Sequence, residues 1–384
     1  MQADAHERID RRVTAITLGA ALLIALYTGF RLPNGWSATL DAVSLTDGFH
    51  RRFVVGTLLR PLALATDYDY RLFATFSYLV LAALLAVIAR AALRTQLLEQ
   101  RLVVIAWLLL PTGGFLFNEV GYFEQLHFLM LFASIWLVRR ERFVAATAVM
   151  ALAPLVHEIA ILTVLPLFGL VLLRTVSPKR AVIATAIPAL INLIVLAIPP
   201  ASDGAIATLS ASLTHANFTY RPDALELFSR AQSDNWGLYS VHNVVVYVRP
   251  IAYVLIALLV GLWFTDRESW RKDNDRQPSW VILLASCAAI AVPSLLVYGG
   301  WDGNRWRFLV VTSFFVVVWL ALEGRGKKPL RIGTITMLVL SVLIASRFEL
   351  WYFDRLQPRE LGYRPVVKFF MHIADGSLFT MADE

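Results

Sequence analysis

The stretch FVAATAVMALAPLVHEIAILTVLPLFGLVLL spans residues 143–173 and is apolar except for a histidine and a glutamate near its middle. It is longer than the ~20 residues that an α-helix needs to cross a bilayer. Two interpretations are therefore open: one long kinked helix, or two short helices that turn at PLVHE. The choice matters because it sets the side of the membrane on which every later loop lies.

Composition places the rest of the chain in the same class as this stretch. Of its 384 residues 58% are hydrophobic and only 16% are charged, and the mean hydropathy is +0.62. Soluble domains carry about a quarter charged residues, so the composition predicts an all-α polytopic integral membrane protein. Only five of the 35 basic residues are Lys, which is typical of a GC-rich genome and favours a bacterial plasma membrane.

Further apolar segments predict membrane helices along most of the chain. They lie at residues 13–30, 72–90, 102–117, 122–138, 181–198, 248–265, 280–298, 306–323 and 330–347. The lone Cys287 excludes an internal disulfide and a cysteine metal cluster. No Gly-rich phosphate loop, zinc motif or nucleic-acid module is visible, so no nucleic-acid partner is expected.

The positions of the basic residues favour two helices within 143–173. With that choice, 20 of the 35 Lys and Arg residues fall in short segments on one side of the membrane, at 1–12, 90–101, 139–142, 174–180, 266–278 and 325–331. Short cytoplasmic loops are the ones that concentrate basic residues. The prediction is therefore about eleven membrane helices, with the N-terminus in the cytoplasm and the C-terminus outside.

This topology divides the chain into three parts. Residues 1–265 form a transmembrane module with long outer loops at 31–71 and 199–247, residues 266–347 add variable helices, and residues 348–384 form an extracytoplasmic tail. Apolar and polar residues are interleaved in the first outer loop. That pattern predicts short helices that lie in the membrane interface.

Ionisable residues from four separate segments are predicted to reach the outer face. The segments are SLTDGFHRRFVVG (44–56), FNEVGYFEQ (117–125), PLVHE (154–158) and YGGWDGNRWR (298–307), and they supply Asp47, His50, Arg51, Arg52, Glu119, Glu124, His157, Glu158, Asp302 and Arg305. Charged groups inside apolar segments are costly, and they typically have a functional role.

Several of these residues also have a purely structural interpretation. Asp47 is a suitable helix cap, the Arg pair suits lipid phosphates, and Asp302 suits an ion pair with Arg305 around a turn. The shared outer face is a stronger indication than any single residue. Arginine forks bind phosphate, and a carboxylate or imidazole accepts a proton from a hydroxyl. The set therefore favours a lipid-linked phosphate substrate presented at the membrane surface.

The pattern over residues 8–260 resembles the GT-C superfamily of polytopic glycosyltransferases. An inner N-terminus is followed by a long first outer loop with interfacial helices and an acidic residue, and then by short connections. The resemblance implies a polyprenyl-linked sugar donor, extracytoplasmic catalysis and a base in the first outer loop, which is Asp47 or its neighbour Asp41. Many members have two acids one residue apart, and within the first outer loop this pattern is found only at Asp67 and Asp69. The segments DGFHRRFVVG, PLVHE and WDGNRW also resemble O-antigen polymerase-like proteins.

The resemblance and the residues together predict a sugar transfer from a polyprenyl-phosphate donor to a glycan or lipid acceptor. Asp47, His157 and Glu158 are the expected catalytic residues, with Asp47 as the base. The expected substrate-binding residues are His50, Arg51, Arg52, Glu119, Glu124, Asp302 and Arg305. No metal site is indicated in the sequence, and dependence on a divalent metal is left open.

Two other functions remain open at this point. A polymerase or ligase that uses polyprenyl-pyrophosphate oligosaccharides would need the same arginine-rich outer loops. A transporter or flippase of lipid-linked solutes would instead be expected to show internal repeats and ionisable groups near the middle of the membrane. No repeat is visible in the chain, which favours an enzyme.

Overall fold

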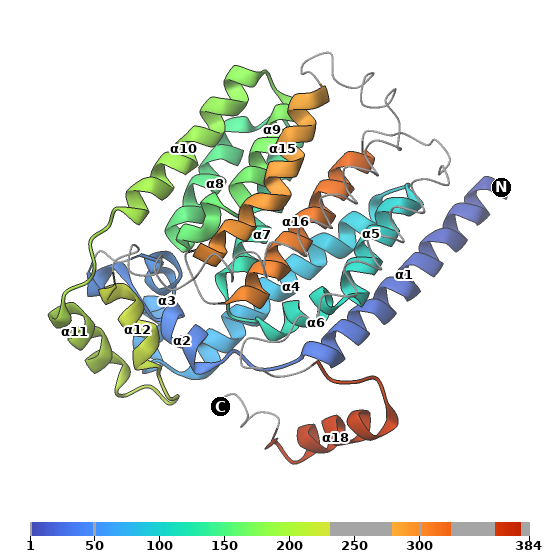
Figure 1. Cartoon of the computed structure of the whole chain (residues 1–384). Coiled ribbons are helices and arrows are strands. Elements are labelled where there is room, and N and C mark those ends of the chain that lie inside the picture. Colours follow the sequence, from blue (N-terminus) through green and yellow to red (C-terminus); the bar gives the residue numbers. More distant parts are fainter. Residues whose placement is uncertain (1, 49–50, 231–278, 299–301, 324–357, 378–384) are drawn as a thin grey trace.

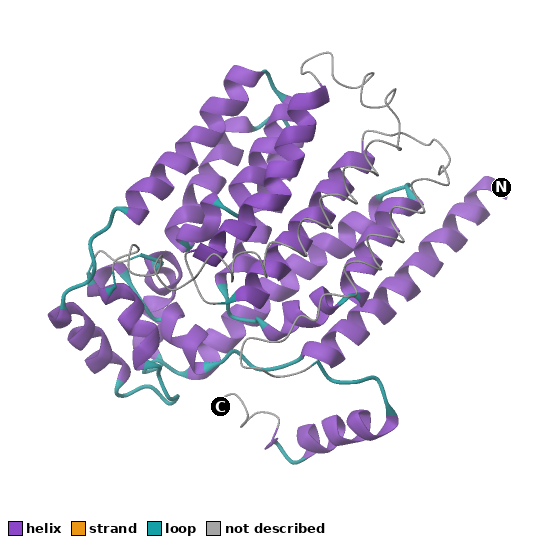
Figure 2. Cartoon of the chain, viewed as in Figure 1, coloured by secondary structure: helices purple, strands orange, loops and turns teal. Residues whose placement is uncertain are grey.

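The computed structural model describes residues 2–48, 51–230, 279–298, 302–323 and 358–377, and these contain helices but no strand (Figures 1 and 2). In chain order the helices are α1 (Gln2–Gly29), α2 (Gly35–Asp41), η1 (Leu45–Asp47), α3 (Phe53–Ala65), α4 (Tyr70–Arg94), α5 (Leu98–Leu109), α6 (Pro111–Asn118), α7 (Phe123–Arg139), α8 (Phe143–Val156), η2 (Glu158–Ile161), α9 (Val164–Thr175), α10 (Pro178–Leu196), α11 (Asp203–Leu213), α12 (Pro222–Ser229), α15 (Ser279–Ala291), η4 (Val292–Tyr298), α16 (Gly303–Glu323) and α18 (Tyr363–Ala374).

Several of these helices are long and apolar enough to cross a membrane. Within the described ranges there are six such spans, or seven if α5 and α6 together form one. This agrees with the predicted helical membrane protein. Two expected spans, 248–265 and 330–347, lie outside the described residues, so the eleven-helix topology and its orientation stay predictions.

The predicted single span at 102–117 is wrong as a straight helix. The chain bends by 61° between α5 and α6. Leu110 adopts an extended conformation (ψ 166°) and Pro111 begins α6. Proline disfavours the helical region for the residue before it and lacks an N–H, so it ends one helix and starts another.

The stretch 143–173 forms two helices that run in opposite directions, as the distribution of basic residues predicts. His127 and Ser134 of α7 contact the carbonyl oxygens of Ala153 and Ala146 at 3.0 and 3.2 Å, so α8 is antiparallel to α7. The chain leaves α8 at His157, whose backbone is extended. It then returns, because α10 packs against α8, η2 and α9, and the loops before α8 and after α9 lie at the same end of the bundle (Figure 2).

The two ends of the bundle differ in character (Figure 1). At one end, here called the basic end, lie the arginine-rich turns at residues 94–101, 139–142 and 174–180. At the other end, here called the loop end, α2, η1, α3, α11 and α12 pack on one another. The predicted short helices of the first outer loop are thus present, as α2, η1 and α3.

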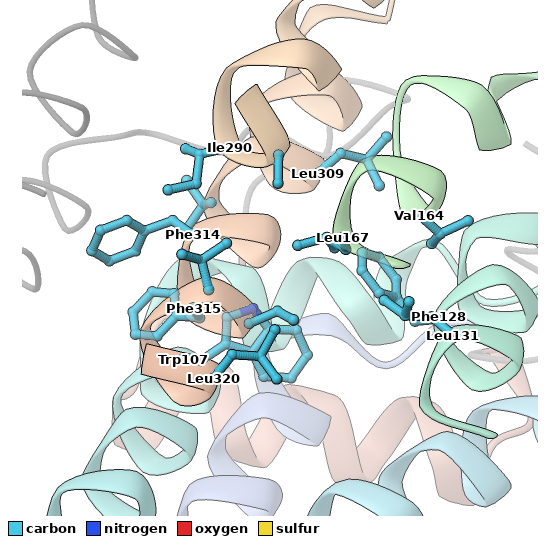
Figure 3. Close-up of a cluster of buried hydrophobic side chains, with 14 of the residues drawn as sticks. Trp107, Phe128, Leu131, Val164, Leu167, Ile290, Leu309, Phe314, Phe315 and Leu320 are labelled. Carbon is cyan, nitrogen blue, oxygen red and sulfur yellow. The ribbon is translucent and has the colours of Figure 1, made fainter. Parts of the chain in front are cut away.

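Each part of the molecule has its own apolar core. In the bundle, α5, α7, α9, α15 and α16 bury large side chains such as Trp107, Leu131, Leu167, Phe314 and Phe315 (Figure 3). At the loop end a second cluster joins α2, α3, α11 and α12. The segments that carry the polar residues are therefore held by packing on both sides.

Gly29, at the end of α1, allows α1 to approach α6 closely. A Cβ at this position would lie 1.7 Å from the carbonyl oxygen of Gly114. We expect Gly29→Ala to lower the free energy of unfolding by about 1–3 kcal/mol, because overpacking forces the backbones apart. Thermal unfolding in detergent measures the effect. Gly19→Ala is the matched control, since nothing lies within 4 Å of its added methyl, and an equal loss there would contradict the explanation.

Candidate functional site

Arg52 lies at the start of α3 in an unusual backbone conformation. Its φ of 65° and ψ of 22° fall in the left-handed region, which non-glycine residues seldom adopt. Its Nε donates to Oε1 and Oε2 of Glu158 at 3.2 and 3.0 Å, and its Nη2 donates to Oε1 at 2.5 Å. Unusual backbone of this kind persists where the surroundings enforce it, often at functional sites.

Arg51 reaches the same carboxylate from a different anchor. Its Nη2 donates to the carbonyl oxygens of Leu227 and Arg230, at 2.8 and 3.1 Å, and its Nη1 lies 3.9 Å from Oε1 of Glu158. Burial lowers the pKa of Arg51, and Glu158 opposes this effect. Two arginines thus converge on one carboxylate among the residues that the structure describes.

His157, which precedes Glu158, places its Nδ1 3.1 Å from Oε2 of Glu158. The backbone N–H of Ile159 also points at Nδ1, at 3.3 Å. The two contacts make opposite demands, because the carboxylate needs an N–H and Ile159 needs a lone pair. A lone pair facing a carboxylate costs more than a long hydrogen bond, so we assign the proton to Nδ1.

A second polar group surrounds Arg305 in the first turn of α16. Its guanidinium donates to Oε1 of Glu124, from Nε at 2.7 Å and also from Nη2, and it lies over the ring of Tyr122 at 4.6 Å. Its backbone N–H donates to Oδ1 of Asp302 at 3.2 Å. Arg305 thereby joins α16 to the first turn of α7.

Glu119 lies in the turn between α6 and α7 and completes this second group. Its Oε1 accepts a hydrogen bond from Nδ2 of Asn118 at 3.1 Å, and Oε2 is buried with no hydrogen-bond partner among the residues that the structure describes. Burial raises the pKa of Glu119 to about 8, and the negative charge of Asp302 adds to the effect. Glu119 therefore exchanges its proton near neutral pH, as acid–base groups in active sites do.

Two histidines lie between the groups. The ring of His157 is 6.2 Å from that of His127 and 5.8 Å from that of Phe123. His157 interacts electrostatically with both Arg52 and Glu124. The two groups therefore form one continuous network, contributed by the residues before α3, the α6–α7 turn, the start of α7, the α8–η2 junction and the start of α16.

Charge is distributed unevenly across this network. One half holds Arg51 and Arg52 against Glu158, and the other holds Glu119, Glu124 and Asp302 against Arg305, with Arg31 close enough to influence Glu119. The first half can hold an anion. The second half can hold or release protons, because carboxylates that crowd together do not all ionise at once.

Asp47 lies in different surroundings from the other expected catalytic residues. Its Oδ2 accepts from the backbone N–H of Ser44 at 3.1 Å in a capping box, and its Oδ1 accepts from Nη1 of Arg60 at 2.8 Å. Both carboxylate oxygens are thus engaged in holding η1 and α3 together. This geometry favours the capping role that the sequence left open.

We therefore expect Asp47→Asn to act on stability. Only one oxygen remains to serve both donors, so the free energy of unfolding should fall by about 0.5–2 kcal/mol, as for the loss of other helix caps. Asp67→Asn in the same loop is the control, because Asp67 has a positive φ that Asn also tolerates. A loss of catalysis in Asp47→Asn at unchanged melting temperature would instead support Asp47 as the base.

Of the other acids in the first outer loop, Asp69 has a structural role. Asp69 caps α4, where it accepts from the N–H of Arg71 at 2.8 Å and from Nδ2 of Asn217 at 3.0 Å; the first of these bonds lowers its pKa. Asp41 is buried, which raises its pKa well above the ordinary value. His50 lies outside the described residues.

The sequence interpretation missed two members of this region. His127 belongs to α7 and is buried, and its Nε2 contacts the carbonyl oxygen of Ala153 at 3.0 Å. A histidine in an apolar helix was a visible signal. No comparable indication was present in the sequence for Arg60, because its ion pair with Asp47 depends on how α3 packs against η1.

The polar network has further properties that bear on its chemistry. Among the described residues, no group of three or more His, Cys, Asp or Glu side chains has an arrangement that could hold a metal ion. Comparison of the chain with protein-family models, with curated proteins and with solved structures gave no match.

Proposed function

We propose that the chain is a membrane glycosyltransferase, which moves a sugar from a polyprenyl-phosphate donor to a glycan or lipid acceptor at the loop end. The observation that carries this proposal is the division of one buried network into an arginine half and a carboxylate half. Sugar transfer from a phosphate needs both kinds of group at once. One must hold the phosphate that leaves, and the other must take the proton of the acceptor.

Arg51 and Arg52 form the phosphate-binding half of the proposed site. As the bond between the sugar and the phosphate breaks, the phosphate oxygen keeps the electron pair and gains negative charge. Arginines that are already oriented stabilise this charge more in the transition state than in the ground state. Glu158 holds Arg52 through both Nε and Nη2, so the fork is oriented before the substrate arrives.

Glu119 is the proposed base, in the role that the sequence assigned to Asp47. Its pKa of about 8 lies close to the operating pH, where general bases are most effective. In the reaction Glu119 would take the proton of the acceptor hydroxyl while the hydroxyl oxygen bonds to the sugar. Glu124 would remain paired with Arg305.

The position of the network favours transfer over transport. Glu124 and Arg305 lie in the first turns of α7 and α16, and His157 lies at the end of α8. The charges therefore cluster at one end of the bundle, whereas coupling sites of transporters lie near the middle of the membrane. A phosphate headgroup at the membrane surface meets the network at this depth.

Binding of polyprenyl phosphate, the product carrier, tests the phosphate half directly. We expect Arg52→Gln to weaken its binding to the purified protein by roughly 10- to 100-fold, which corresponds to one charge-assisted hydrogen-bonded contact. Arg52→Lys keeps the charge but loses the planar set of N–H donors of the guanidinium, so its loss of affinity should be intermediate. Polyprenol, which lacks the phosphate, should bind equally to all variants.

Arg221→Gln is the matched control for that experiment. Arg221 is at the same end of the bundle, is half exposed and pairs with Asp223 at 2.7 Å, so its loss should leave binding unchanged. An Arg52→Gln protein that remains folded and binds polyprenyl phosphate as tightly as the wild type would reject the phosphate site. A panel of polyprenyl-phosphate and polyprenyl-pyrophosphate sugars, scored by product length, then separates transferase from polymerase.

A further inference from the structure

A pocket of about 600 Å³ opens between α4, α5, α7 and α16, and no residue of the polar network lines it. At one end its lining includes Leu116, Phe128 and Phe308, which lie about one turn from the charged residues of the loop end. From Phe308 it extends along α16 to Glu323, or ~22 Å at 1.5 Å per residue. The pocket therefore ends at the basic end of the bundle.

The inner wall of this pocket offers little to a polar ligand. Apolar side chains dominate it, and they include the aromatic residues Trp107, Phe132, Phe315 and Trp319. The polar atoms in the wall are already used, because Nε1 of Trp107 donates to Oγ1 of Thr312 at 3.2 Å and Nε2 of Gln100 donates to the carbonyl oxygen of Trp319 at 3.1 Å. A long apolar chain is the ligand that such a lining accepts.

The rim at the basic end is, in contrast, positively charged. Arg90 and Arg94 are exposed on one face of α4 and line the pocket, and neither makes an ion pair or hydrogen bond with the residues that the structure describes. Arg139 also lines the rim, but it is neutralised by Glu323 at 2.6 Å. The spacing of Arg90 and Arg94, four residues apart on a helix, directs both side chains to the same side.

We propose that this pocket binds an anionic phospholipid, whose acyl chains fill the aromatic interior and whose phosphate lies against Arg90 and Arg94. An apolar tube with a cationic rim matches an amphipathic anion in both shape and charge. A free phosphate would leave the interior empty, and a zwitterionic lipid would gain less from the two arginines. This lipid site is separate from the polar network at the loop end.

Tryptophan quenching by brominated lipids tests the proposal, because Trp107, Trp136 and Trp319 line the pocket. Purified protein in detergent is titrated with dibromo-phosphatidylglycerol or dibromo-phosphatidylcholine. We expect the anionic lipid to quench at a mole fraction roughly tenfold lower, which two arginines near an anionic headgroup can supply. Trp136→Phe and Trp319→Phe should remove part of the quenched signal.

The rim variant Arg90→Gln/Arg94→Gln should abolish the preference for the anionic lipid. Its control, Arg142→Gln/Arg180→Gln, removes the same charge from the same end of the bundle but from residues that do not line the pocket, and it should keep the preference. Equal quenching by both lipids in the wild type would overturn the proposal. So would an equal loss of preference in the rim variant and its control.

A second pair of variants tests the apolar interior. Val87 lines the pocket and is 37% exposed, whereas Leu79 on the same helix is 65% exposed and does not line it. We expect Val87→Phe to raise the lipid concentration needed for half-maximal quenching severalfold, and Leu79→Phe to leave it unchanged. Unchanged quenching in Val87→Phe would show that the acyl chains do not enter the pocket.

Discussion

Glu158→Gln is expected to lower the free energy of unfolding by about 3–5 kcal/mol, the cost of removing one partner from a buried ion pair. Glu158 is only 4% exposed and is approached by Arg51, Arg52 and His157. Without its charge, the guanidinium of Arg52 remains buried with no compensating anion. Thermal or denaturant unfolding in detergent measures the loss.

A double-mutant cycle with Arg52→Gln attributes that loss to the pair. The double variant should be clearly more stable than the sum of the single effects implies, because it also removes the Arg52 guanidinium that Glu158→Gln leaves without its carboxylate. Glu323→Gln provides the control, since Glu323 pairs with Arg139 where both are nearly half exposed, and such pairs contribute at most ~1 kcal/mol. Equal losses in Glu158→Gln and Glu323→Gln would contradict a buried, pre-oriented arginine site.

Glu119→Gln is expected to reduce sugar transfer by roughly 10²–10⁴-fold, the usual contribution of a general base. In the wild type the rate should rise as the pH passes through about 8, because the ionised form of Glu119 is the one that accepts a proton. The variant should lose this rise along with the rate. Glu226→Gln, an exposed carboxylate on α12, is the control. Unchanged transfer in Glu119→Gln would remove Glu119 from the mechanism.

The same substitution has a consequence for stability that does not depend on activity. Between its ordinary pKa of 4.5 and its folded pKa of about 8, Glu119 keeps its proton in the folded chain but loses it in the unfolded chain. Stability must therefore fall as the pH rises through that range, by an amount on the order of 5 kcal/mol for about 3.5 units at ~1.4 kcal/mol per unit. Melting temperatures from pH 5 to 8.5 should decline in the wild type and decline less in Glu119→Gln. If the melting temperatures of the two proteins declined equally with pH, Glu119 would not be the group whose pKa is raised.

Much of the arrangement at the loop end was predictable from the sequence. The hairpin at 143–173 followed from basic residues, because each reversal of the chain changes the side on which the next arginines lie. That single choice placed PLVHE and YGGWDGNRWR at the same end as FNEVGYFEQ and the first outer loop. In the structure, Arg52 meets Glu158 and Glu124 meets Arg305 at this end.

The roles of individual residues were less predictable. Asp47 and Arg52 are five residues apart, yet Asp47 pairs with Arg60 and caps η1 whereas Arg52 reaches across to Glu158. The left-handed backbone at Arg52 decides this difference, and no residue preference predicts it, since arginine disfavours that conformation. Pro111 is visible in the sequence as a residue that ends helices. The apolar residues on both sides of it nevertheless led to the prediction of one continuous helix.

The amino-acid sequence by itself determined that the chain is a helical membrane protein, with arginines gathered at one end and ionisable groups at the other. These properties follow from the type and position of single residues, because each apolar side chain contributes to burial independently of its distant neighbours. Only the tertiary structure decided which charges neutralise each other and which carboxylate is buried enough to keep its proton. Those properties depend on distances between groups such as Arg52 and Glu158, which lie 106 positions apart in the chain, and on the exclusion of water around them.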